Sequence, residues 1–134
     1  MLLVMFMKVE ILRFDDFGRG ICYVNDKVTF VPFSMPGDVL EIKITEEKKN
    51  YNEGKIVKII KPSKNRVVPP CPYFGVCGGC SYQMLRYEEN LLEKQNNVIN
   101  YFKKNGLLIN PSIIKNDRPY NYRNKITLKI VNRK

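Results

Sequence analysis

The chain has 134 residues, 44% of them hydrophobic and 27% charged, so it is long enough for one ordinary globular domain or two small ones. Its formal charge of +10, from 23 Lys and Arg against 13 Asp and Glu, favours a polyanionic partner such as RNA or DNA over a generally basic surface. It contains no histidine, which excludes zinc sites that combine cysteine with histidine.

The first seven residues are apolar, but the stretch is short. No basic segment precedes it, and the charged residues Lys8 and Glu10 follow at once. We therefore expect neither a signal peptide nor a membrane span. We expect the protein to lie in the cytoplasm, where thiols stay reduced.

Short apolar or alternating runs follow along the first sixty-odd residues. They are typical of strands and lie at residues 8–14, 21–24, 28–31, 39–44 and 54–60. Glycine-, proline- or charge-rich turns separate them, the longest being a charged loop at 46–52. Five short strands at this spacing predict a small closed or half-closed barrel over residues 1–62, so the expected fold class is β-rich, α+β overall.

One of the four cysteines, Cys22, lies in a predicted strand. A free cysteine in a strand usually packs as a small hydrophobic residue. We therefore expect Cys22 in the core, and ligation of a metal is the alternative.

The other three cysteines form a C-x5-C-x2-C array at Cys71, Cys77 and Cys80, within a basic linker and cysteine-rich loop that we assign to residues 63–86. Two glycines between the last two cysteines allow a sharp turn, so both thiolates can face one ion. The array indicates an all-thiolate zinc site or an iron–sulfur cluster, and either needs a fourth ligand. A disulfide with a spare thiol is the alternative.

Residues 87–104 carry apolar side chains at helical spacing, and Gly106 suits the position after a helix end, which predicts one helix. The tail at 125–131 alternates like a strand and predicts the start of a second β region. That strand has no evident partner sheet. We therefore expect residues 87–134 to be the beginning of a second domain that is truncated in this chain.

Three features of the chain belong together: the small barrel, the run C-P-Y-F-G-V-C-G-G-C-S-Y-Q from Cys71 to Gln83, and the Y-R-N-K sequence at 122–125. Together they resemble the S-adenosylmethionine-dependent RNA uracil-C5 methyltransferases, the bacterial enzymes that make 5-methyluridine in 23S rRNA. The G-R-G-I stretch at 18–21 and the V-P-F-S-M-P-G-D loop at 31–38 are similar to that family's TRAM domain, an OB-like RNA-binding barrel.

The resemblance implies that Cys71, Cys77 and Cys80 bind a 4Fe–4S cluster whose fourth cysteine lies further downstream in the family and has no counterpart here. The family's methyl-donor domain, nucleophile and general base also have no counterpart in these 134 residues. We therefore expect the RNA-binding N-terminal segment of such an enzyme, without catalytic residues and inactive alone. S-adenosylmethionine would bind only in the full-length enzyme. The resemblance implies 23S rRNA as the partner and a monomeric chain.

RNA binding by an OB-like barrel needs a cationic groove and exposed aromatic rings. Phe17, Tyr23 and Phe33 are candidate rings, and the last two could equally be core residues. The candidate RNA-binding cations are Arg19, Lys27, Arg66, Arg123 and Lys125. For Arg123, a structural salt bridge is the alternative.

Two other functions remain open at this point. The chain could be a standalone TRAM RNA-binding module with a structural zinc or iron–sulfur loop. It could also be a zinc-ribbon-like interaction protein that uses Cys22 as the fourth ligand. A cluster would be structural, holding the linker to the following domain, and redox sensing is the alternative.

Overall fold

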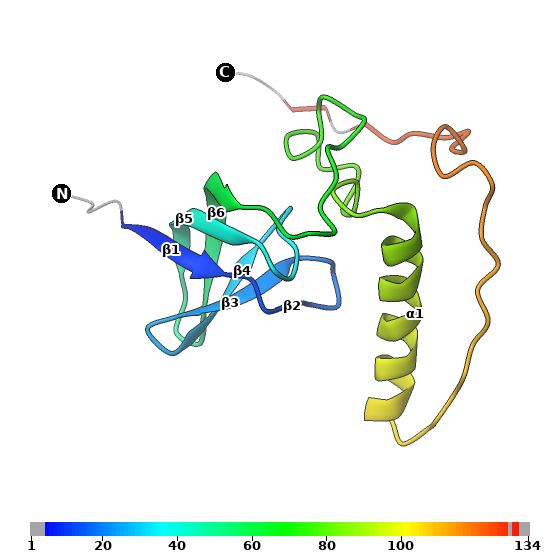
Figure 1. The fold of residues 1–134 in the computed structure, drawn as a ribbon, viewed down its shortest axis with the longest axis horizontal. Helices are drawn as coiled ribbons and strands as arrows, with labels where there is room; N and C mark the ends of the chain where they lie inside the picture. Colours follow the sequence, from blue (N-terminus) through cyan, green and yellow to red (C-terminus); the bar gives the residue numbers. More distant parts are fainter. Residues whose placement is uncertain (1–4, 129, 132–134) are drawn as a thin grey trace.

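The computed structural model describes residues 5–128, 130 and 131. It consists of a curled sheet, an irregular loop segment, one long helix and an extended tail (Figure 1). The strands are β1 (Phe6–Glu10), β2 (Arg13–Phe14), β3 (Gly20–Val24), β4 (Lys27–Val31), β5 (Val39–Glu47) and β6 (Tyr51–Lys61). The helix is α1 (Tyr87–Lys104).

All the strands belong to one sheet, in the order β1-β5-β6-β4-β3-β2. The two outermost strands, β1 and β2, follow each other in the chain, separated only by Ile11 and Leu12. The N–H of Ile11 donates to the carbonyl of Asp38, and the N–H of Leu12 donates to the carbonyl of Ile21, both at 2.9 Å. The backbone therefore pairs with the β5 side of the sheet up to Ile11 and with β3 from Leu12 onward. In this way one continuous segment supplies the strands at both ends of the sheet and closes it. The prediction of a small barrel is confirmed, with its expected first strand divided in two.

Alternate residues of the strands fill the barrel. On β5, Leu40 and Ile42 are fully buried whereas Lys43 is exposed. The buried set of this core is Val9, Ile11, Cys22, Val24, Val31, Leu40 and Ile42. The expectation that Cys22 packs in the core is confirmed, and its burial raises the pKa of the thiol to about 11.

A second, smaller core joins the barrel to the cysteine loop. Met35, from the loop after β4, packs with Met84 and Leu85 from the segment just before α1. Partly buried aromatic side chains surround it, namely Phe14, Phe74 and Tyr82. The N–H of Val67 also donates to the carbonyl of Met84 at 2.9 Å. The segment between β6 and α1 is therefore packed against the barrel.

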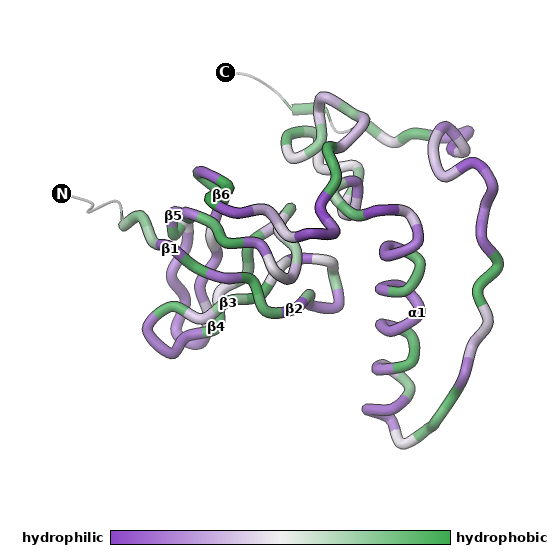
Figure 2. The backbone as a smooth tube through the Cα atoms, viewed as in Figure 1, coloured by the Kyte–Doolittle hydropathy of each residue, from purple (hydrophilic) through white to green (hydrophobic). Residues whose placement is uncertain are grey.

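Helix α1 spans the predicted residues, 87–104. It ends in a Schellman motif, because the N–H of Gly106 donates to Lys103 and the N–H of Leu107 donates to Phe102. Gly106 has φ +80°, the left-handed conformation that glycine adopts without strain. No residue of α1 is buried, and apolar and polar positions alternate along it in Figure 2.

The expected strand at 125–131 is not observed, since residues 125–128, 130 and 131 have no regular structure and residue 129 lies outside the described residues. Among the described residues, no neighbouring strand lies beside this tail to pair with its backbone. Its alternating pattern alone therefore does not form a strand here. In the part of the chain that the structure covers, no helix has the length and apolar character needed to cross a membrane.

Candidate nucleic-acid interface and cysteine loop

A buried ion pair organises the loop between β4 and β5. Arg66 Nη2 lies 2.6 Å from Asp38 Oδ2, and Arg66 Nε donates to Asp38 Oδ1 at 3.0 Å. The Asp38 carboxylate also accepts the N–H of Met35 at 3.0 Å and that of Ser63 at 2.9 Å. Asp38 is fully buried and the Arg66 side chain is 12% exposed. One carboxylate therefore holds its own loop and the linker after β6 together.

The same guanidinium holds the backbone of an aromatic residue, Phe33. Arg66 Nη2 donates to the carbonyl of Phe33 at 2.9 Å. Phe33 has φ +64°, a left-handed conformation that is rare for a bulky residue and is kept only where its surroundings impose it. Its half-buried ring meets Phe74 of the cysteine loop edge to face, with 5.1 Å between centroids. Arg66, which stays a predicted RNA contact, thus holds the backbone that carries this ring.

Phe33 is one wall of a surface hollow of about 450 Å³. The hollow lies between the end of β4, the paired parts of β5 and β6, and the cysteine loop. Its lining residues are Arg19, Phe30, Pro32, Phe33, Thr45, Glu53, Gly54, Lys55, Ile56 and Gly75. Two aromatic rings, two cations and one carboxylate therefore share one concave surface.

Arg19 is held rigidly in this hollow. Its Nε lies 2.6 Å from Asp15 Oδ2, and Asp15 Oδ1 accepts the N–H of Arg19 at 2.7 Å. Its guanidinium carbon lies 4.2 Å from the centroid of the Phe30 ring, a cation–π contact. Nη1 also lies 3.9 Å from Glu53 Oε1. The Arg19 side chain remains 31% exposed, so it offers part of its cation to a ligand.

The structure does not bring the other predicted RNA contacts to this hollow. Lys27 Nζ donates to Glu47 Oε1 at 3.1 Å and to the carbonyl of Lys48 at 3.0 Å, tying the start of β4 to the β5–β6 turn. Arg123 and Lys125 are exposed in the tail. Sequence reasoning missed Phe30 and Glu53, which face each other in the register of the parallel β4–β6 pair. No local sequence pattern reports that register.

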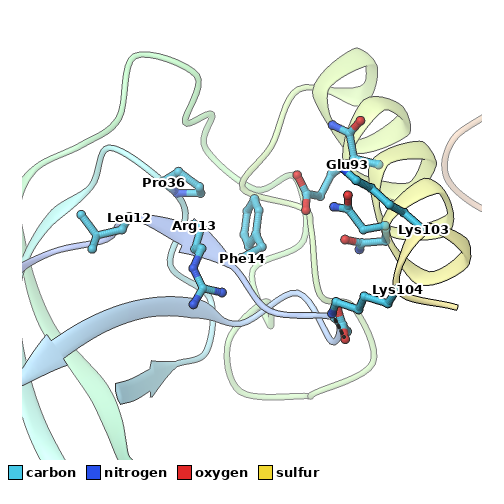
Figure 3. A pocket seen from close by; sticks show the side chains of 11 residues that line it. Leu12, Arg13, Phe14, Pro36, Glu93, Lys103 and Lys104 are labelled. Carbon is cyan, nitrogen blue, oxygen red and sulfur yellow. Dashed lines mark ion pairs between the residues drawn. The ribbon is translucent and has the colours of Figure 1, made fainter. Parts of the chain in front are cut away.

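A second hollow, of about 720 Å³, separates the barrel from α1 (Figure 3). Arg13 and Phe14 line it from β2, and Glu93 and Lys104 line it from the helix. Burial raises the pKa of Glu93. Lys104 Nζ lies 3.6 Å from Asp16 Oδ2, an exposed ion pair. Three asparagine amides add to the lining, so this surface is polar and of mixed charge.

Hydrogen bonds within the loop segment hold the cysteine loop. The N–H of Cys71 donates to the Gln83 side-chain oxygen at 3.2 Å, and the N–H of Cys77 donates to the carbonyl of Tyr73 at 2.9 Å. Gly78 has φ +74°, the turn expected between the last two cysteines. A Cβ built on Gly79 would lie 3.5 Å from Cys77 Sγ, so this sulfur sits over the bend.

The donor chemistry of the loop fits an iron–sulfur cluster or an all-thiolate metal site. Cys71 is half-buried, Cys77 and Cys80 are exposed, and all are free thiols. Nevertheless, the described residues contain no set of three cysteine or carboxylate side chains close enough to hold a metal ion. The loop therefore supplies suitable ligands whose sulfur atoms would have to move together on binding.

Residues 6–57 match the TRAM domain family. The chain is 38% identical over 121 residues to the 23S rRNA (uracil(1939)-C(5))-methyltransferase RlmD of Legionella pneumophila strain Lens, covering 89% of this chain and 27% of that protein. RlmD of Francisella tularensis subsp. novicida is 38% identical over 125 residues, covering 90% and 28% respectively.

Among solved structures, the tRNA (uracil-54, C5)-methyltransferase of Pyrococcus abyssi, in complex with S-adenosyl-L-homocysteine, aligns with a TM-score of 0.49 and 30% identity. The alignment covers 72% of this chain and 21% of that one. The chain spans about a quarter of the length of the curated relatives that it matches.

Proposed function

We propose that this chain, which carries a TRAM domain and resembles the N-terminal part of the RNA uracil-C5 methyltransferases, recognises RNA for such an enzyme. The observation that carries the proposal is its 38% identity, along 89% of its length, to a 23S rRNA methyltransferase. We infer 23S rRNA as the target, the cytoplasm as the location and a monomeric chain. Methyl transfer from S-adenosylmethionine belongs to the complete enzyme.

RNA would bind through phosphate contacts around the barrel. The net charge of +10 supports this, because each phosphate neutralised by a cation releases counterions. Exposed lysines on β5 and β6, namely Lys43, Lys55 and Lys58, are available on the barrel surface. Arg123 and Lys125 would extend the contact along the tail. Arg19, Arg66 and Lys27 would act from their ion-paired positions, chiefly by shaping the surface.

The cysteine loop would carry an iron–sulfur cluster. Cys71, Cys77 and Cys80 would bind it as thiolates, with a fourth ligand from outside these residues. Free thiols on one short loop support this assignment. The cluster would supply structural cross-linking rather than redox chemistry, since the loop also packs through Phe74 on the barrel. A zinc ion in a standalone RNA-binding module is the competing assignment.

Filter binding of a short single-stranded rRNA segment at several salt concentrations tests the RNA-binding proposal. With about four to six phosphate contacts, the slope of log K against log salt should be roughly −3 to −4 for single-stranded RNA. Lys58→Ala should weaken binding and make the slope less steep. Lys49→Ala, in the exposed β5–β6 turn beside Glu46 and Glu47, is the matched control and should change little. A flat salt profile would contradict the proposal.

A further inference from the structure

We propose that the hollow lined by Phe30 and Phe33 binds one unstacked nucleobase of single-stranded RNA, with guanine preferred. This inference rests on the proposed RNA-binding function and specifies where a base, rather than a phosphate, is held. The hollow has a volume of about 450 Å³, within the range of roughly 300–1,000 Å³ found for small-molecule sites.

The walls of the hollow suit a flat aromatic ligand. Phe30 and Phe33 present rings, while Pro32 and Ile56 add apolar surface. Proteins that bind single-stranded nucleic acid use such rings as platforms on which bases stack. The guanidinium of Arg19 lies 4.2 Å from the centroid of the Phe30 ring, and Tyr51 meets that ring edge to face with 5.7 Å between centroids. Phe30 is therefore fixed by its neighbours, and Phe33 offers the ring on which a base would stack.

The second ring is fixed in advance as well. The left-handed backbone of Phe33 is held by the hydrogen bond from Arg66, and its ring is held by Phe74. Gly75, next to Phe74, completes the wall, and a Cβ built on it would lie 4.0 Å from the Phe33 ring. Strained backbone that its surroundings maintain is typical of binding sites. Pre-positioned rings lose little conformational entropy when a ligand binds.

A carboxylate in the lining determines which part of a nucleotide can enter. Glu53 is 40% exposed, and its Oε1 lies 3.9 Å from Arg19 Nη1. It would repel a phosphate but accept hydrogen bonds from a base edge. Guanine offers two adjacent N–H donors on one edge, whereas the single ring N–H of uracil lies between two carbonyl oxygens. Exposed Lys55, at the same hollow, would reach the phosphate outside.

The test uses the full chain and a five-nucleotide uridine RNA with guanosine at its centre, titrated by fluorescence anisotropy. Phe33→Leu keeps apolar volume but removes the stacking face, and should weaken binding roughly 5- to 100-fold with an unchanged salt slope. Tyr101→Leu removes an exposed ring of α1 outside the hollow and should change affinity less than twofold. Circular dichroism and thermal unfolding check that each variant is folded.

Base preference is tested with a second pair of variants. Glu53→Gln should reduce the preference for a central guanosine over a central uridine roughly 5-fold or more, since a carboxylate pairs better with two donors than an amide does. Glu10→Gln, an exposed carboxylate on β1 outside the hollow, is its control. An RNA with an abasic central position should bind the unaltered protein as weakly as the guanosine RNA binds Phe33→Leu. The difference in affinity between the abasic and the guanosine RNA on the unaltered protein can be measured even if the Phe33 variant does not fold.

The outcomes separate this inference from the function on which it rests. If the unaltered chain fails to bind any RNA, the proposed function is wrong. If it binds RNA with the expected salt dependence, but the abasic and guanosine RNAs bind equally and Phe33→Leu is silent, the base pocket is wrong while the function stands. Loss of binding in Phe33→Leu together with equal affinities for guanosine and uridine overturns the base preference.

Discussion

Arg66 and Asp38, 28 residues apart in the chain, form a two-point ion pair that joins the linker after β6 to the loop after β4. The shorter contact, from Nη2 to Oδ2, is 2.6 Å. The same arginine holds the carbonyl of Phe33. Arg66, which the sequence predicts as an RNA contact, therefore also holds the backbone of Phe33, the aromatic residue that lines the candidate site.

Arg66→Ala should destabilise the fold by about 3–5 kcal/mol, because it leaves the carboxylate of Asp38 buried without its partner. The free energy of unfolding from urea titration measures this. RNA affinity should also fall in conditions where the variant stays folded, because the carbonyl of Phe33 loses its donor.

Two controls separate charge from geometry. Arg66→Lys keeps the charge but cannot make the forked contact, so its stability should lie between those of the unaltered protein and Arg66→Ala. Arg123→Ala removes an exposed arginine of the tail and should leave stability unchanged. Equal stability of Arg66→Ala and the unaltered chain would show that the ion pair contributes nothing net.

The barrel could be predicted from the sequence because its signals are local. Alternation on β5 places Leu40 and Ile42 inside, and Gly106 marks the end of α1. The turn between β5 and β6 was predicted too long, since the charged residues Glu46 and Glu47 pair across to β6. Polar composition indicated a loop, whereas cross-strand hydrogen bonds extended both strands.

Gly20→Ala should destabilise the barrel by roughly 1–3 kcal/mol, because the added methyl group would overpack the core. A Cβ at this position would lie 1.9 Å from Ser34 Oγ and 2.8 Å from Ile11 Cγ2. Ser34 is buried and donates to the carbonyl of Val31, so it cannot move aside freely. Gly79→Ala, whose Cβ meets only Cys77 Sγ at 3.5 Å, is the control for thermal unfolding. Equal melting temperatures for the two variants would contradict the packing argument.

Cys22 should be the least reactive thiol of the native protein. Burial raises its pKa from 9.0 to about 11, so at pH 8 hardly any thiolate forms, whereas Cys77 and Cys80 are exposed. Alkylation followed by mass spectrometry should label Cys22 only after unfolding. Fast native labelling of Cys22 would contradict its place in the core.

The same shift sets a pH dependence of stability. The thiol of Cys22 is held protonated in the folded protein, so its contribution is fully present below pH 9 and is lost as the pH rises towards about 11. Cys22→Ser removes this titration, and the serine hydroxyl can donate to the carbonyl of Thr29 as the thiol does. The difference in stability between the two proteins should therefore change across that pH window and stay constant below it.

The candidate site was less accessible to sequence reasoning than the fold. The array of Cys71, Cys77 and Cys80 is visible as a spacing, but the hollow depends on Phe30 and Glu53 meeting through the parallel β4–β6 register. Arg19 was identified as a cation, yet its fixed place over Phe30 depends on Asp15 across a turn. The site therefore depends on contacts between residues that are distant in the sequence, and no local pattern predicts those contacts.

Anaerobic reconstitution with ferrous iron and sulfide should give a brown protein with a sulfide-to-iron charge-transfer band. The reason is the thiolate array, together with the absence of histidine from the chain. Replacing Cys71, Cys77 and Cys80 by serine should abolish the colour. Cys22→Ser should retain it, because that thiol is buried in the barrel core and its Sγ points to the carbonyl of Thr29.

The cluster should be labile in this chain. Three thiolates leave one iron with an open position, and the loop that holds them exposes Cys77 and Cys80 to solvent. In air the colour should therefore fade within hours, and an added small thiol should slow the loss by occupying the open position. A colourless protein with one tightly bound zinc would identify the loop as a zinc site instead. If Cys22→Ser then also lost the zinc, the buried thiol would be the fourth ligand, and the barrel would have to open to supply it.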